Sequence, residues 1–189
     1  MIGEGFASEL ARAQGGDEAA FAQLWRDLNP ALLRYLALGG EPADDVAAET
    51  WTSVVKGLRR FRGDERAWRS WVFTTARRRA VDAGRRRARA AQVEVASGQW
   101  QVEALAPDPA DAVVAGEDTD AALRLVAQLS PLQAEVVVLR VVAGLSVEEV
   151  ARIVGRSPGA VRVATHRGLR ALEQVVANQG VTPSRAGTL

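Results

Sequence analysis

Arginine, the residue that binds phosphate and guanine best, is concentrated at two places in the chain. Seven arginines occur within residues 77–89, where Asp82 is the only acid, and four more recur within residues 156–170. On a helix the seven arginines of the first group repel one another, and each ion pair with Asp82 offsets this repulsion by only ~0.3–0.5 kcal/mol. Both groups therefore indicate binding to a polyanion. The alternative for each group is a solvent-exposed charged surface that binds no ligand.

The second arginine group lies in a pattern typical of a helix-turn-helix. Ser146 and Glu149 form a capping box, Gly155 supplies a left-handed turn residue, and Ser157-Pro158 opens a helix expected to reach about Ala177. The second helix of such a pair enters the DNA major groove, where Arg162 can donate two hydrogen bonds to guanine N7 and O6. An ordinary helical hairpin with a solvated basic face is the alternative.

Catalytic groups do not form a recognisable set in the sequence. The acidic pairs Asp44-Asp45 and Glu148-Glu149 are adjacent residues, which do not face each other on a helix. No nucleophile, glycine-rich phosphate loop or metal-ligand set accompanies them, and the chain has no cysteine and one histidine. We therefore expect no enzymatic activity, no metal and no cofactor.

The elements that position the arginines are expected to be helices. The chain is 48% hydrophobic, 25% charged and only 5% aromatic, which disfavours an all-β fold. Asp17 is placed as the N-cap of a helix that Pro30 interrupts or kinks. A second helix begins near Pro42, a loop follows at residues 62–65, and a third helix carries the arginines from Ala67 to Arg89. Ser130-Pro131 then starts the first helix after a long acidic segment.

Charge divides the chain into blocks that its total of +1 conceals. Residues 1–56 carry −5, residues 57–89 carry +9, residues 90–120 carry −7 and residues 121–189 carry +4. The third block has no basic residue and no sustained periodicity, so we predict a linker between two domains. With no signal peptide and no long apolar run, the protein is expected in the cytoplasm, without membrane insertion.

Two blocks of the sequence resemble the extracytoplasmic-function sigma factors of bacterial RNA polymerase, within the sigma-70 family. DDVAAETWTSVVKGLRRFRG and WRSWVFTTARRRAVDAGRRRAR resemble sigma region 2, and LSPLQAEVVVLRVVAGLSVEEVARIVGRSPGAVRVATHRGLRAL resembles sigma region 4. The resemblance implies an all-α protein of two small domains, a region 2 helical bundle and a region 4 helix-turn-helix. We expect an N-terminal extension at 1–16, region 2 at 17–89, an acidic linker at 90–120, region 4 at 121–177 and a disordered tail at 178–189.

The resemblance also implies partners and site residues. The partners would be promoter DNA, the β and β′ subunits of core RNA polymerase, and an anti-sigma factor. The minus-35 element would be read by Arg156, Ser157, Arg162, Val163, His166, Arg167 and Arg170. The minus-10 element would be bound by Arg62, Gly63, Asp64, Arg66, Trp68, Arg77, Arg78, Arg85 and Arg86. Core polymerase would dock on Asp44, Asp45, Glu49, Thr50 and Trp51.

Some positions depart from the family pattern. Ala48 replaces a glutamine common in the polymerase-docking motif, and Arg78 replaces an asparagine common in the strand-binding helix. Of the tryptophans, Trp51 and Trp71 fit apolar stripes, whereas Trp68, at a loop edge, is the one open to stacking on a base. The alternative functions are a stand-alone helix-turn-helix regulator of duplex DNA and a protein-interaction scaffold.

Overall fold

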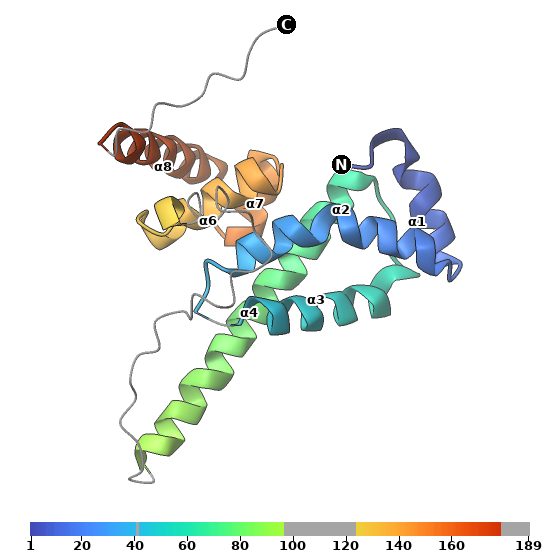
Figure 1. Ribbon diagram of the computed structural model, residues 1–189, viewed down its shortest axis with the longest axis horizontal. Helices are drawn as coiled ribbons and strands as arrows, with labels where there is room; N and C mark the ends of the chain where they lie inside the picture. The colour runs from blue at the N-terminus through green and yellow to red at the C-terminus, as the bar shows by residue number, and fades with distance from the viewer. Residues whose placement is uncertain (41, 97–123, 179–189) are drawn as a thin grey trace, which may run out of the picture.

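The computed structural model describes residues 1–40, 42–96 and 124–178, and the regular secondary structure in these ranges is helical (Figure 1). The helices are η1 (Gly3–Gly5), α1 (Phe6–Gln14), α2 (Glu18–Leu36), α3 (Ala43–Leu58), α4 (Glu65–Ala96), α6 (Pro131–Val137), the π-helical turn η3 (Val138–Val142), α7 (Val147–Val154) and α8 (Pro158–Asn178). The expected all-α fold is confirmed. Most of the expected linker, with Trp100, and the expected tail lie outside the described residues.

The helix ends expected from the sequence are found in the structure. The Asp17 carboxylate accepts a hydrogen bond from the Ala20 amide at 3.0 Å and caps α2. Ser146 and Glu149 exchange the two hydrogen bonds of a capping box at the start of α7. Gly155 has φ +67°, the left-handed conformation that a side chain would strain. These local signals place the turn between α7 and α8.

Two helices run further than expected. Pro30 does not interrupt α2, which continues to Leu36, because the residues around the proline are held in the core. Helix α4 continues past Arg89 to Ala96, since residues 90–96 contain neither glycine nor proline. In Figure 1 this C-terminal part of α4 projects beyond the other helices.

The N-terminal segment, expected as an extension, is part of the folded core. Helix α1 packs along α2 and buries Phe6, Leu10 and Ala13. Their spacing puts these three side chains on one face, and they belong to the same hydrophobic cluster as the α2 residues Ala20, Leu24 and Leu28. Helices α1, α2, α3 and α4 therefore form one bundle.

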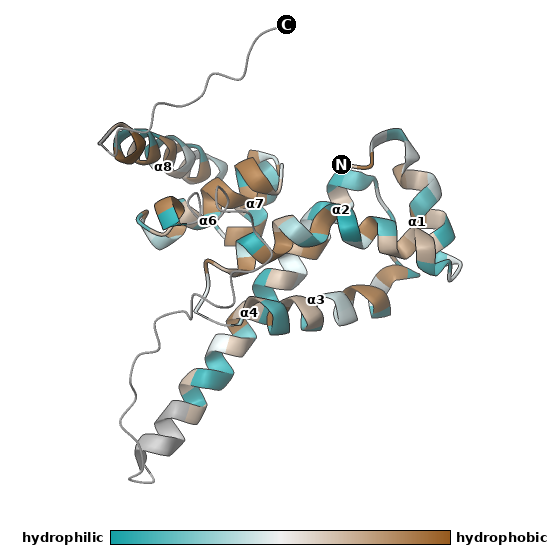
Figure 2. Ribbon diagram, viewed as in Figure 1, coloured by the Kyte–Doolittle hydropathy of each residue, from teal (hydrophilic) through white to brown (hydrophobic). Residues whose placement is uncertain are grey.

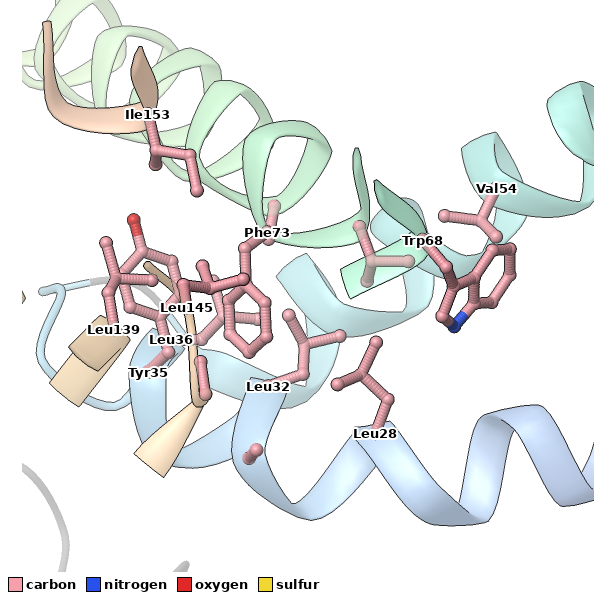
Figure 3. Close-up of a cluster of buried hydrophobic side chains, with 14 of the residues drawn as sticks. Leu28, Leu32, Tyr35, Leu36, Val54, Trp68, Phe73, Leu139, Leu145 and Ile153 are labelled. Carbon is pink, nitrogen blue, oxygen red and sulfur yellow. The ribbon is translucent and has the colours of Figure 1, made fainter. Parts of the chain in front are cut away.

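One hydrophobic cluster continues from this bundle into the helices after the acidic segment. Leu32 and Leu36 of α2 and Phe73 of α4 belong to the same cluster as Leu139 and Ile153 (Figure 3). Helix α7 packs on α4, and η3 packs on α2. Figure 2 shows hydrophobic segments on α2, α6 and α7. The two parts of the chain thus lie against each other.

Candidate nucleic-acid interface

Helix α8 has one buried face and one basic, exposed face. Val161 and Ala164 are 1% and 7% exposed, and Gly168 is buried beside them. The structure exposes all seven residues expected at the minus-35 element, two in the turn and five on α8: Arg156, Ser157, Arg162, Val163, His166, Arg167 and Arg170. The spacing of the five puts them on the side of the helix opposite to Val161. Sequence and structure therefore agree on one continuous surface.

A close helix contact holds this surface in place. A Cβ atom at Gly168 would lie 2.7 Å from Cγ2 of Val137, so α8 approaches α6 at a point where no side chain fits. At the start of α8 the Ser157 hydroxyl accepts a hydrogen bond from the Ala160 amide at 3.2 Å. The angle and the start of the exposed helix are thus both determined.

On this surface, Arg162 is paired with an acidic residue of α7. Its Nη2 lies 3.2 Å from Oε1 of Glu148, and both side chains are 62% exposed. Ion pairs this exposed contribute at most about 1 kcal/mol. A nucleic-acid phosphate or base can therefore replace Glu148 at small cost.

The arginines of α4 differ in exposure, and several of them contact other parts of the protein. Arg77 Nε donates to Glu135 of α6 at 2.8 Å, and Arg86 Nη2 donates to Glu49 of α3 at 2.8 Å. Arg78 and Arg85 are exposed, and Nη1 of Arg85 lies 4.0 Å from Oδ1 of Asp82 on the same helix. Other arginines of the run contact the protein as well: Arg79 donates to Ser53, and Arg87 to the Gly40 carbonyl. The exposed group is smaller than the sequence suggests.

The loop before α4 exposes Arg62, Gly63 and Asp64, and Arg66 is exposed in the first turn of α4. Trp68 is different, because it is only 2% exposed. Its ring packs edge-on against Phe61 and Trp71, each with a centroid distance of 5.6 Å. The expectation that Trp68 is open for stacking on a base is therefore wrong. The first turn of α4 directs this residue into the bundle.

The acidic start of α3 exposes Asp44, Asp45 and Glu49, as expected for a docking surface. Thr50 and Trp51 are instead buried, at 0% and 7% exposed. The Thr50 hydroxyl donates to the Val46 carbonyl at 2.7 Å, and Trp51 Nε1 donates to Asn29 Oδ1 at 2.8 Å. Their assignment to an exposed docking surface is corrected, because Trp51 packs on α2 and the Thr50 hydroxyl is buried and bonded within α3.

Two exposed α3 residues were missed in the sequence analysis. Thr52 is exposed and Val55 is 52% exposed, which is unusual for a valine in a bundle. Thr52 follows Ala48 and Glu49 by four and three residues, and Val55 follows Thr52 by three, so helical periodicity was the signal that could have found them.

Polar side chains of α2 and α4 form hydrogen bonds with the helices after the acidic segment, beside the shared hydrophobic cluster. The Tyr35 hydroxyl donates to Oε1 of Glu135 at 2.9 Å, the oxygen that also accepts from Arg77. Burial, and then the charge of Glu135, raise the pKa of Tyr35 well above its ordinary value. Arg69, 6% exposed, donates to Asp27 at 2.9 Å and to the Ala143 carbonyl at 3.0 Å. No local sequence pattern pointed to these residues.

Metal-holding clusters and membrane-spanning helices are absent from the described ranges. No cluster of three histidine, aspartate or glutamate side chains there is arranged to hold a metal ion. Each helix in those ranges is too short or too polar to cross a membrane.

Comparison with known proteins identifies both halves of the chain. Residues 21–90 match the family model of sigma-70 region 2, and residues 119–172 match that of sigma-70, region 4. The chain is 32% identical to the ECF RNA polymerase sigma factor SigD of Mycobacterium tuberculosis, over 95% of this chain and 88% of SigD. It is 34% identical to the ECF RNA polymerase sigma factor ShbA of Streptomyces griseus, over 85% of this chain and 90% of ShbA.

A solved structure shares the fold. The sigma factor RpoE of Bartonella quintana, crystallised with the anti-sigma factor NepR, superimposes with a TM-score of 0.62 at 24% identity, over 83% of this chain and 96% of RpoE. The family models and the identity to SigD disfavour a stand-alone regulator of duplex DNA. The chain therefore belongs to the extracytoplasmic-function sigma factors of the sigma-70 family, which bind core RNA polymerase and direct it to promoters.

Proposed function

We propose that this sigma factor divides its work between three surfaces: α8 reads the minus-35 element, α4 with the loop before it binds the minus-10 element, and the acidic start of α3 docks on polymerase. The observation that carries this proposal is that two exposed basic surfaces lie on separate helices, with exposed carboxylates on a third. Regions 17–89 and 121–177 would be the corresponding domains. The protein would act in the cytoplasm without catalytic chemistry of its own.

At the minus-35 element, Arg162 would read a base and the arginines further along α8 would bind phosphates. Arg162 is near the N-terminus of α8, the end of a recognition helix that reaches base edges. Val163, 49% exposed, offers an apolar surface to a thymine methyl group. Arg167 and Arg170, one and two turns later, suit the DNA backbone.

At the minus-10 element, Arg78 and Arg85 would bind phosphates of the opened strand while the loop holds a base flipped out of the duplex. Both side chains are exposed on the part of α4 that also carries Arg86. Unstacking a base costs a few kcal/mol, so the loop must supply contacts that the duplex has lost. Arg62 and Arg66 are two of the exposed cations at the loop that can do so.

Docking on the β′ subunit would use Asp44, Asp45 and Glu49, extended by Thr52 and Val55. An apolar residue next to carboxylates suits a protein interface with a small hydrophobic centre and a polar rim. The β subunit would contact region 4. We also propose an anti-sigma factor as a partner, since RpoE of Bartonella quintana was crystallised with the anti-sigma factor NepR.

Run-off transcription with purified core polymerase tests this assignment. Arg162→Ala is expected to weaken promoter use through the minus-35 element by ~1–3 kcal/mol. Arg78→Ala is expected to lower DNA affinity at every sequence and to reduce the salt slope by about one. Arg26→Ala, on the exposed side of α2, is the matched control. Unchanged minus-35 preference in Arg162→Ala would contradict the assignment of α8.

Asp45→Lys tests the docking surface, with Glu18→Lys as its control, because Glu18 is exposed in the first turn of α2 as Asp45 is in the first turn of α3. We expect Asp45→Lys to weaken binding to core polymerase in a pull-down while its circular dichroism spectrum stays unchanged. Wild-type binding by this variant would refute the proposed docking surface.

A further inference from the structure

The loop between α3 and α4, residues 59–64, contacts aromatic rings of α4 through Phe61. Phe61 stacks on Trp71 with a centroid distance of 5.1 Å and an interplanar angle of 16°. It meets Trp68 edge-on at 5.6 Å. These contacts hold the middle of the loop against the bundle but leave its two ends to other groups.

Gln14, the last residue of α1, holds the first end of the loop. Its Nε2 donates to the Leu58 carbonyl and to the Phe61 carbonyl, each at 2.9 Å. Leu58 ends α3, and its carbonyl also accepts a hydrogen bond from the Phe61 amide at 3.1 Å. One amide group of α1 therefore ties the end of α3 to the loop residue three positions later.

Glu65, the first residue of α4, holds the second end. Its two carboxylate oxygens accept hydrogen bonds from the Ile2 and Gly3 amides, each at 2.9 Å. A carboxylate at a helix N-terminus is also favoured by the helix dipole. Phe6 of the same N-terminal segment packs on Trp68, with a centroid distance of 6.4 Å.

The loop backbone decides where its functional side chains stand. Arg62 Nη1 donates to the Arg59 carbonyl at 3.0 Å and to the Phe61 carbonyl at 2.7 Å, and the latter is the oxygen that Gln14 also holds. Asp64 accepts from the Ala67 amide at 2.8 Å. A binding site that is displaced by even a fraction of an ångström loses selectivity.

We propose that residues 2–14 form a bracket, a segment that fixes both ends of the loop through the hydrogen bonds of Gln14 and those to Glu65. Gln14 and Glu65 are then positioning residues that set the selectivity of the loop for the flipped minus-10 base. This inference rests on the proposed function of the loop. Neither residue contacts DNA in the proposal, because Gln14 and Glu65 are both half-buried and directed at the loop ends. They act through the backbone that carries Arg62.

Transcription from a promoter library randomised across the minus-10 element tests the bracket. Gln14→Met keeps the side-chain length and removes the donor, and Glu65→Gln keeps the shape and removes the charge. The preference ratio between the best and second-best base at the flipped position is expected to fall roughly fivefold in each variant, comparable to one lost hydrogen bond. Affinities for a minus-35 duplex and for core polymerase are expected to stay unchanged. Gln23→Met, exposed on α2, is the matched control.

The outcomes separate the bracket from the function of the loop. Arg62→Ala is measured in parallel, because it removes a proposed DNA contact directly. If Arg62→Ala changes the preference ratio and the two bracket variants do not, the bracket is overturned and the proposed loop function stands. If Arg62→Ala also leaves the ratio unchanged, the loop function itself fails, and the bracket fails with it. A lower melting temperature with an unchanged ratio shows a purely structural role and likewise overturns the bracket.

Discussion

Tyr35 of α2 and Glu135 of α6, which lie 100 residues apart in the sequence, are joined by a hydrogen bond of 2.9 Å between the phenol and the carboxylate. The tyrosine ring also meets Phe73 of α4 edge-on at 5.5 Å. This contact connects region 2 to region 4, and the same carboxylate oxygen holds Arg77. An arginine expected to bind DNA is therefore engaged within the protein.

Tyr35→Phe tests how much this contact stabilises the packed arrangement. The variant keeps the ring and removes a hydrogen bond to a charged acceptor, so the free energy of unfolding is expected to fall by ~1–2 kcal/mol. Urea denaturation followed by circular dichroism measures the change. In a double-mutant cycle with Glu135→Ala, which removes the acceptor, additive effects of the two changes would show that the two side chains do not interact.

Alkaline pH tests the same tyrosine in the unmodified protein. Its pKa is raised by burial and by the Glu135 charge, so its stabilising contribution is complete below the ordinary tyrosine pKa of about 10. Above that pH the unfolded chain ionises and the folded chain does not, and stability is lost as pH rises.

Tyr35 is the only tyrosine in the sequence, so the ultraviolet absorbance of tyrosinate reports this group alone. We expect tyrosinate to form together with unfolding. Ionisation near the ordinary pKa in a chain that stays folded would contradict the prediction. The Tyr35→Phe variant should lose this alkaline fall in stability.

Arg69→Met tests the buried cation between region 2 and region 4. The substitution keeps much of the packing volume, leaves the Ala143 carbonyl without the Arg69 donor and leaves Asp27 paired only with the Met1 amino group. We expect a loss of about 2–4 kcal/mol in the free energy of unfolding, below the value for a fully buried pair because Asp27 is 19% exposed. Denaturation curves measure it. A variant as stable as wild type would show that the pair contributes nothing.

Gly168→Ala and Gly159→Ala form a matched pair on α8. A methyl group at Gly168 would meet Val137 at 2.7 Å, so we expect the close contact to cost ~1–3 kcal/mol of stability. At Gly159 the nearest atom is 4.0 Å away, and the better helix propensity of alanine should stabilise the fold by up to about 1 kcal/mol. Melting temperatures of both variants measure the difference. Equal effects would indicate that α8 shifts freely on α6.

The local structure of this protein followed from short stretches of sequence. Asp17, Ser146 and Ser157 cap helices as their types predict, and Gly155 adopts the left-handed turn expected between α7 and α8. Caps and turns depend on neighbours within four residues, so the sequence alone determined the helix-turn-helix and its exposed basic face. The resemblance to sigma regions 2 and 4 then led to the family.

The tertiary structure alone decided which of the expected site residues are available. Periodicity predicts one buried stripe, but helices α3 and α4 are covered on more than one side, which buries Thr50, Trp51 and Trp68. Arg77 is engaged by a carboxylate 58 residues away, and Tyr35 by the same group from 100 residues away. Contacts at such separations depend on how helices pack, and no local pattern of residue types contains that information.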